Sequence, residues 1–220
     1  MKTNHIRYIA LLSIVFFALS VGCHSGQKDS SSIADSANKA QIKSTDSADK
    51  AQIKATDSAN KAQASSSDSS LKASKSLKED ASKFLVKSYE SGIYEIQLSE
   101  LAATNALDPD VKNLAVSLVA GHKAIDSKIS AIAASANFLL PSAINADHQK
   151  SLQDLGKLTG ADFDKKYINT IVSGHENAVS DYKDAYKNLS PGDTKTFAGE
   201  TLPTIEDHLA MAKKVKDRIK

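Results

Sequence analysis

The sequence predicts an all-α fold, a four-helix up-and-down bundle of the ferritin-like type preceded by a disordered tether. Apolar residues recur at steps of three and four along four segments, which is the spacing of a core-facing helix. Gly and Pro lie mostly between these segments, and no alternating strand pattern stands out. The segments form two hairpins joined by a long link, the connectivity of bundles with a lengthwise crossover.

The first bundle helix is expected to begin near residues 77–80 and to end near Asn105. Two of its core-facing positions are serines, so its stripe is weaker than the others. Small side chains beside the carboxylate of Glu95 leave room for a partner. The stripe consists of Phe84, Ser88, Ser91, Glu95, Leu98 and Ala102.

The second helix is expected over residues 109–136. Asp108 can cap its start, and Pro109 suits the first helical position. Its stripe is apolar apart from one histidine, His122. The stripe consists of Val111, Ala115, Leu118, His122, Ile125, Ile129, Ile132 and Ala136.

The link over residues 137–160 is expected to contain a short helix around residues 143–155. The third helix is expected over residues 161–188, with Asp162 and Asp164 capping and charging its start. The fourth helix is expected over residues 194–219. Each of these helices also carries one histidine among apolar core positions, namely His175 in the third and His208 in the fourth.

The four polar core residues, Glu95, His122, His175 and His208, are predicted to meet in one layer. Glu95 lies 13 residues before Asp108 and His122 lies 14 residues after it, so the first hairpin brings them level. His175 and His208 flank the turn at Pro191 at similarly matched distances. Because a helix rises by ~1.5 Å per residue, each hairpin places its two polar residues side by side.

This Glu/His cluster has two interpretations. Three imidazoles and one carboxylate could hold one divalent transition metal such as Zn, Fe, Mn or Cu. Alternatively, the cluster is free of metal and its hydrogen bonds fix the packing of the bundle. Ferritin-like di-iron sites use a Glu-x-x-His pattern, but Val119, Val172 and Ile205 precede the histidines by three. With no nucleophile triad or phosphate loop either, a non-enzymatic binding or structural role is favoured.

The N-terminus resembles that of a bacterial lipoprotein. Residues 1–22 have a charged start and an apolar run that is too short to span a bilayer but suits a signal peptide. Cys23, the only cysteine, follows Ser-Val-Gly as in a lipobox and is expected to be lipidated. The alternative is an ordinary secretory signal that leaves a free cysteine. His24 after the cysteine favours the outer membrane, with the domain in the periplasm or at the cell surface.

Residues 23–79 are expected to form a disordered tether. An 11-residue repeat begins at Asp35, but its apolar residues do not form a broad stripe, and its composition suits a solvated spacer. The alternative is a helix that forms on a membrane or a protein partner. Either conformation would hold the folded domain clear of the membrane. The net charge of +2 gives no reason to expect a nucleic acid partner, and His5, His24 and His148 are treated as bystanders.

Residues 80–220 resemble the bacterial domain of unknown function 4142 family. The resemblance implies a ferritin-like fold and an exported protein, without assigning a reaction. It rests on Phe84-Leu85, the segment EIQLSELA that contains Glu95, Gly121-His122, LTGADFD at residues 158–164 with Tyr167, His175-Glu176, and Leu202-Pro203 with His208-Leu209.

Overall fold

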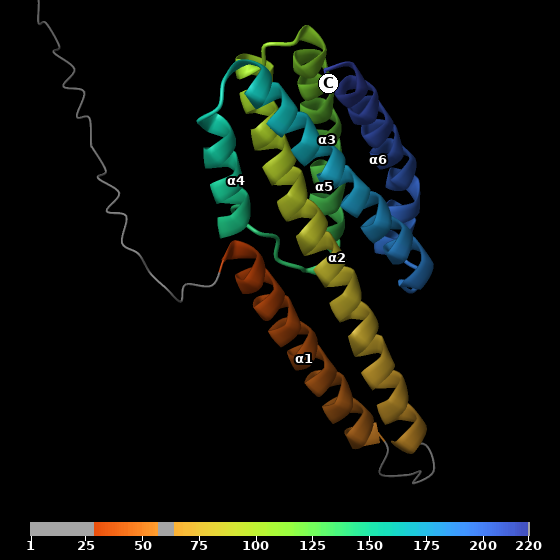
Figure 1. Ribbon diagram of the computed structural model, residues 1–220. Helices are drawn as coiled ribbons and strands as arrows, with labels where there is room; N and C mark the ends of the chain where they lie inside the picture. The colour runs from red at the N-terminus through yellow and green to blue at the C-terminus, as the bar shows by residue number, and fades with distance from the viewer. Residues whose placement is uncertain (1–28, 57–63, 220) are drawn as a thin grey trace, which may run out of the picture.

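The computed structural model describes residues 29–56 and 64–219, and these residues form helices and no strand (Figure 1). The all-α prediction is therefore confirmed for this part of the chain. The helices are α1 (Ser30–Thr56), α2 (Ala64–Asn105), α3 (Pro109–Ala136), α4 (Ala146–Gly156), α5 (Gly160–Asn188) and α6 (Asp193–Arg218). From α3 onward, each helix begins and ends within three residues of its expected bounds.

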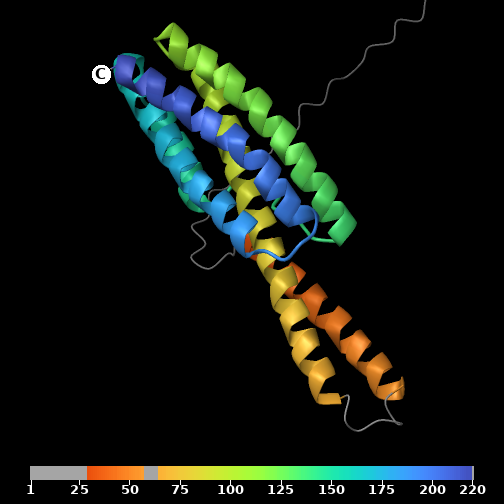
Figure 2. The same cartoon turned by 90° about the vertical axis from the view of Figure 1, so that its right-hand side faces the viewer.

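Four of the helices surround a common interior. Helix α2 packs against α3, and α5 packs against α6, as the two predicted hairpins require. Contacts between α3 and α6 and between α2 and α5 close the arrangement (Figures 1 and 2). The short helix α4 lies outside this group, against α2 and α5. The long link between α3 and α5 therefore connects the two hairpins.

The interior contains two apolar clusters along the helix axes. The first cluster includes Leu98, Leu118, Phe163, Tyr167 and Ala212. The second cluster includes Leu85, Ile129, Tyr182, Phe197 and Ile205. On α3, α5 and α6, the histidine that interrupts the apolar stripe lies between the residues that belong to one cluster and those that belong to the other. A polar layer thus separates two apolar layers.

The turn between α2 and α3 is held from two sides. The Asp108 side chain accepts hydrogen bonds from the backbone N–H groups of Asp110 and Val111, so the predicted cap is present. Asp164 does not cap its own helix. Its carboxylate instead accepts hydrogen bonds from the N–H groups of Leu107 and Asp108, at 3.0 and 2.8 Å. A residue expected to act locally therefore fixes α5 to the α2–α3 turn.

The prediction of a disordered tether is wrong for residues 30–56, which form helix α1. It is also wrong for residues 64–79, which extend α2 toward the N-terminus. Ala34, Asn38 and Ile42 are buried, at steps of four along one face of α1. The Asn38 amide donates to the Leu139 carbonyl at 2.9 Å, and its oxygen accepts from the Leu139 N–H at 2.6 Å. In the first copy of the repeat, the apolar stripe is interrupted because an asparagine occupies the central buried position.

Helix α1 and the N-terminal part of α2 form a hairpin that extends beyond the ends of the other helices (Figures 1 and 2). Within residues 29–56 and 64–219, no helix has both the length and the apolar character needed to cross a bilayer. The predicted signal peptide and Cys23 lie outside the described residues.

Replacing Asn38 with alanine is expected to loosen α1 from the loop that contains Leu139. The change removes both hydrogen bonds of a buried side chain, a loss of about 1–2 kcal/mol. Hydrogen exchange of the α1 amides should therefore become faster than in the wild type. Gln41→Ala, at an exposed position one turn away, is the matched control. Equal exchange in the two variants would show that the Asn38 contact does not hold α1 in place.

Candidate metal centre

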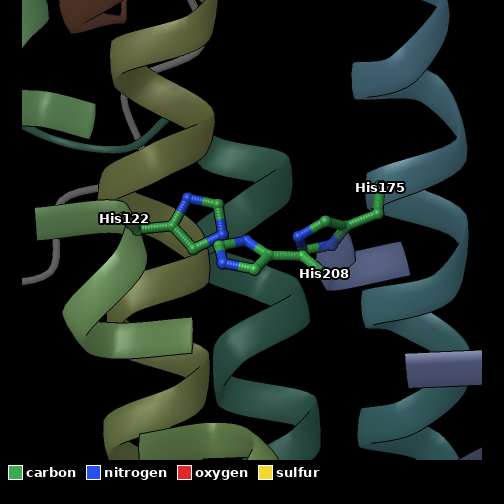
Figure 3. A group of neighbouring side chains, drawn as sticks. All are labelled: His122, His175 and His208. Carbon is green, nitrogen blue, oxygen red and sulfur yellow. The ribbon is translucent and has the colours of Figure 1, made fainter. Parts of the chain in front are cut away.

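The structure brings the three predicted histidines together between the two apolar clusters. His122 comes from α3, His175 from α5 and His208 from α6, and their rings converge (Figure 3). The ring centroids are 5.3 to 5.5 Å apart. One nitrogen from each ring lies within 4.8 Å of the others. Three imidazoles therefore face one small volume inside the protein.

Glu95 adds a carboxylate to this group from α2. Its Oε2 atom lies 2.7 Å from Nε2 of His122 and 3.5 Å from Nδ1 of His175. All four side chains are buried, and His175 has no exposed surface. Each of the four helices that surround the interior thus supplies one member of the predicted cluster.

The hydrogen bonds leave several ring nitrogens without partners. Nδ1 of His175 lies 3.0 Å from the Ile171 carbonyl oxygen, which can only accept, so Nδ1 carries the hydrogen. Its Nε2 atom then has a free lone pair, and it is buried without a hydrogen-bond partner. Nδ1 of His208 is likewise buried without a hydrogen bond, and Nε2 of His122 has only its 2.7 Å contact with the Glu95 carboxylate.

Two glycines make space for the cluster. A Cβ atom at Gly121 would lie 2.5 Å from the His208 ring, and one at Gly174 would lie 2.6 Å from Oε1 of Glu95. Each glycine directly precedes a cluster histidine in the sequence, His122 and His175 respectively. The Gly-His pairs therefore bring in side chains from the neighbouring helices. The Gly-His pairs are visible in the sequence, but the reason for each glycine becomes clear only from the side chain that a neighbouring helix packs against it.

The family described as Domain of unknown function (DUF4142) matches residues 66–215, which is more than half of the chain. The chain belongs to this family. The suspected resemblance is thus confirmed, and the match begins within α2, well before residue 80. No curated protein and no solved structure matches the chain. The function of this DUF4142 domain must therefore be argued from its own residues.

Burial and mutual charge determine the ionisation of the cluster. Burial acts to raise the pKa of Glu95, but the imidazoles outweigh it, His122 most strongly, and the pKa is lowered. Burial acts to lower the pKa of His122, but Glu95 outweighs it and the pKa is raised. Burial lowers the pKa of His175, and burial together with the other two imidazoles lowers that of His208 to about 4. At neutral pH, His175 and His208 are therefore neutral, which is the form that binds metal ions.

A further carboxyl group, missed in the sequence, lies close to the cluster. Asp126 is one turn after His122 on α3 and is buried, with Oδ1 lacking a hydrogen-bond partner. A Cβ atom at Gly92 would lie 2.2 Å from this oxygen, so only glycine fits opposite it. Burial raises the Asp126 pKa to about 7. In the sequence, Asp126 had no signal beyond its position one turn from a histidine.

A cavity of about 440 Å³ reaches the cluster from the side where α2 and α5 meet the start of α4. Its walls include Glu95 and His122, and also His148, which was expected to be a bystander. Nδ1 of His148 lies 2.9 Å from Oε1 of the buried Glu90. The His148 ring stacks on Tyr94 with 3.9 Å between centroids. Sequence reasoning could not place His148, because it lies on the link rather than on a periodic stripe.

Replacing Gly121 with alanine is expected to destabilise the protein, because the new methyl group would displace the His208 ring. Overpacking costs about 1–3 kcal/mol, which outweighs the helix-propensity gain of up to ~1 kcal/mol from removing a glycine. Urea denaturation of the wild type, this variant and a control variant measures the change in the free energy of unfolding. Gly156→Ala is the control, since its Cβ would meet only Leu101, at an ordinary 3.9 Å. That variant should be neutral or slightly stabilised, and a stable Gly121→Ala would contradict the packing argument.

Proposed function

We propose that this protein is a lipid-anchored protein of the bacterial cell envelope whose helical domain binds one divalent transition metal ion. Glu95, His122, His175 and His208 would hold the ion. The observation that carries the proposal is the convergence of three buried imidazoles, which bring one nitrogen each within 4.8 Å of the others, while ring nitrogens of His175 and His208 lack hydrogen-bond partners. The proposal includes the finer classification of the fold as a ferritin-like four-helix bundle with a crossover through α4.

The donor set fits a metal ion. Metal–nitrogen bonds are about 2.0–2.1 Å long, so two imidazole nitrogens on one ion lie at most ~4.2 Å apart. The three nitrogens here lie within 4.8 Å of one another, so small ring rotations suffice to complete the site. The hydrogen bond from His175 Nδ1 to the Ile171 carbonyl orients the ring, as hydrogen bonds to the second ring nitrogen of metal-bound histidines usually do.

The ligand types indicate which class of metal ion the cluster would hold. Imidazole suits Zn, Cu, Fe and Ni, whereas carboxylate-rich sites suit Mg, Ca and Mn. A single carboxylate among three imidazoles therefore points toward the first group.

The cluster also favours one ion rather than two. The residues three positions before the histidines are Val119, Val172 and Ile205, so the cluster has no additional glutamates for di-iron chemistry of the ferritin type. Binding, rather than oxidation of iron, is the activity that this donor set supports.

The second candidate is a metal-free cluster that only fixes the packing. The close contact between Glu95 and His122 favours it, because a buried ion pair can set the register of two helices. It leaves ring nitrogens of His175 and His208 unpaired, however. A buried polar group without a partner costs about 1–3 kcal/mol, so a cluster selected only for stability would be expected to pair them. Metal binding explains these atoms better.

The untagged full-length protein is expected to contain close to one equivalent of a transition metal. His175→Ala should remove a ligand and lose most of it, whereas His148→Ala should retain it because His148 lies outside the cluster. Elemental analysis after dialysis against a weak chelator measures both variants. An absence of metal from the wild type, with no thermal stabilisation by added Zn, Cu, Fe or Mn, would leave only the packing role.

Metal affinity is expected to depend on pH through His122. Its raised pKa means that His122 in the metal-free protein holds its proton to a higher pH than an ordinary histidine does, and this proton must leave when the ion binds. The lowered pKa values of His175 and His208 mean that these two are already neutral. The affinity should therefore fall by about tenfold per pH unit below the His122 pKa, as measured by competition with a chromophoric chelator. A dependence of metal affinity on pH that corresponds to the release of three protons would contradict the assignment of the proton to His122 alone.

The anchor in this proposal is Cys23, behind the signal peptide of residues 1–22. The membrane is thus the expected partner, with the outer membrane favoured and the domain in the periplasm or at the cell surface. Cys23→Ser is expected to move the protein from the membrane fraction to the soluble fraction, because several acyl chains on one residue anchor stably. Fractionation and metabolic labelling with a fatty acid measure the change. An unaltered distribution would remove the anchor from the proposal.

A further inference from the structure

We infer that the cavity beside the cluster is a binding site for a small neutral molecule with a nitrogen or oxygen donor, which binds directly to the metal ion. The inference rests on the proposed metal centre and adds an open coordination position to it. It also assigns the direction from which the ligand arrives, between α2 and α5 beneath the start of α4.

The cavity joins the surface to the cluster. Glu95 and His122 form part of its inner wall. Lys87, Asn177 and Ser180 also line it, and these three residues are exposed. Four protein ligands complete a tetrahedral site, so an outside ligand would bind as a fifth one, which requires that one side of the ion be reachable. The continuous space from the exposed residues to Glu95 and His122 provides that access.

Small side chains create this space. Ser88, Ser91 and Gly92 on α2 face Gly174 and Ala178 on α5 around the cavity. Elsewhere along these helices, large apolar residues such as Leu85, Leu98 and Ile171 fill the interior. The narrow side chains are therefore concentrated at the level of the metal ligands. A volume of about 440 Å³ falls within the usual range for small-molecule sites, about 300–1,000 Å³.

The charges on the walls favour a neutral ligand over an anion. The buried Glu90 carboxylate lines the cavity close to Glu95. Within the described residues, Lys87 is the only lysine on the wall, and its ammonium group lies 2.7 Å from the Asp181 carboxylate. An anion would approach the ion past Glu90 without a free ammonium group to offset the repulsion.

The outer part of the cavity can orient such a ligand through hydrogen bonds. In the described part of the chain, the Asn145 N–H and His148 both contact Oε1 of Glu90. The second oxygen of this carboxylate is thus left for a donor group on the ligand. Ser91 and Asn177 add a hydroxyl and an amide to the lining of the cavity. A compound with an uncharged nitrogen donor and an N–H group matches both ends of the site, since the nitrogen can bind the metal ion and the N–H group can donate to Glu90.

The test uses the untagged full-length protein loaded with Co(II), whose visible absorption bands report the ligands of the ion. Imidazole is the probe, as a neutral nitrogen donor with an N–H group, and azide is the anionic comparison. Imidazole should shift the bands with saturation, and its affinity should exceed that of azide by about tenfold, the effect of one nearby carboxylate charge. Tighter binding of azide would overturn the preference for neutral ligands.

Ser91→Phe and Asn177→Trp fill the cavity from opposite walls, one from α2 and one from the exposed face of α5. Both should retain Co(II) and its bands but lose the response to imidazole. Ala131→Phe, at an exposed position on α3 away from the cavity, should respond like the wild type. Co(II) bands that imidazole does not shift in the wild type, or that it still shifts in both filled variants, would overturn the inference. Failure to bind Co(II) at all would instead refute the metal centre.

Discussion

The fold depends on the burial of one carboxylate and three imidazoles in a single layer between two apolar clusters. Each residue comes from a different helix, so the layer forms only when α2, α3, α5 and α6 stand in one register. Sliding one helix by a turn would move its polar residue into an apolar layer, where an unpaired polar group is costly. The cluster therefore selects one axial alignment, while the apolar clusters above and below it supply most of the stabilisation.

The layer also explains why glycines occur within long helices. A glycine inside a helix costs about 1 kcal/mol relative to alanine, yet Gly121 and Gly174 lie opposite polar side chains of the layer, and Gly92 lies opposite Asp126 beside it. Gly121 admits the His208 ring, Gly174 admits Glu95 and Gly92 admits Asp126. The close approach of neighbouring helices at this level follows from these three residues. The loss of helix propensity is thus offset by contacts that only a residue without a side chain permits.

The sequence was sufficient to predict the helices from α3 onward and the membership of the polar layer, because both depend on local periodicity and on equal distances from two turns. The sequence was not sufficient to predict contacts between segments that lie far apart along the chain. Asp164 looks like a helix cap, but it binds the backbone of the α2–α3 turn. His148 carries no periodic signal, yet it pairs with Glu90 beside the cavity. Helix α1 was missed because the central buried residue on its face, Asn38, is polar and finds its partner about a hundred residues later.

Helix α1 changes how the proposed anchor would position the domain. A tether of residues 23–79 would hold the domain far from the membrane, but α1 runs back along α2, so the two helices add little net distance. Ser30 begins α1 and hydrogen-bonds Ser142, in the link after α3. Only residues 24–29 separate Cys23 from that point, and a fully extended chain covers at most roughly 25 Å over this interval. If Cys23 is lipidated, the link after α3 must therefore stay close to the membrane. The same link leads through Asn145 into α4, which borders the cavity, so the anchor would set the direction that the opening of the site faces.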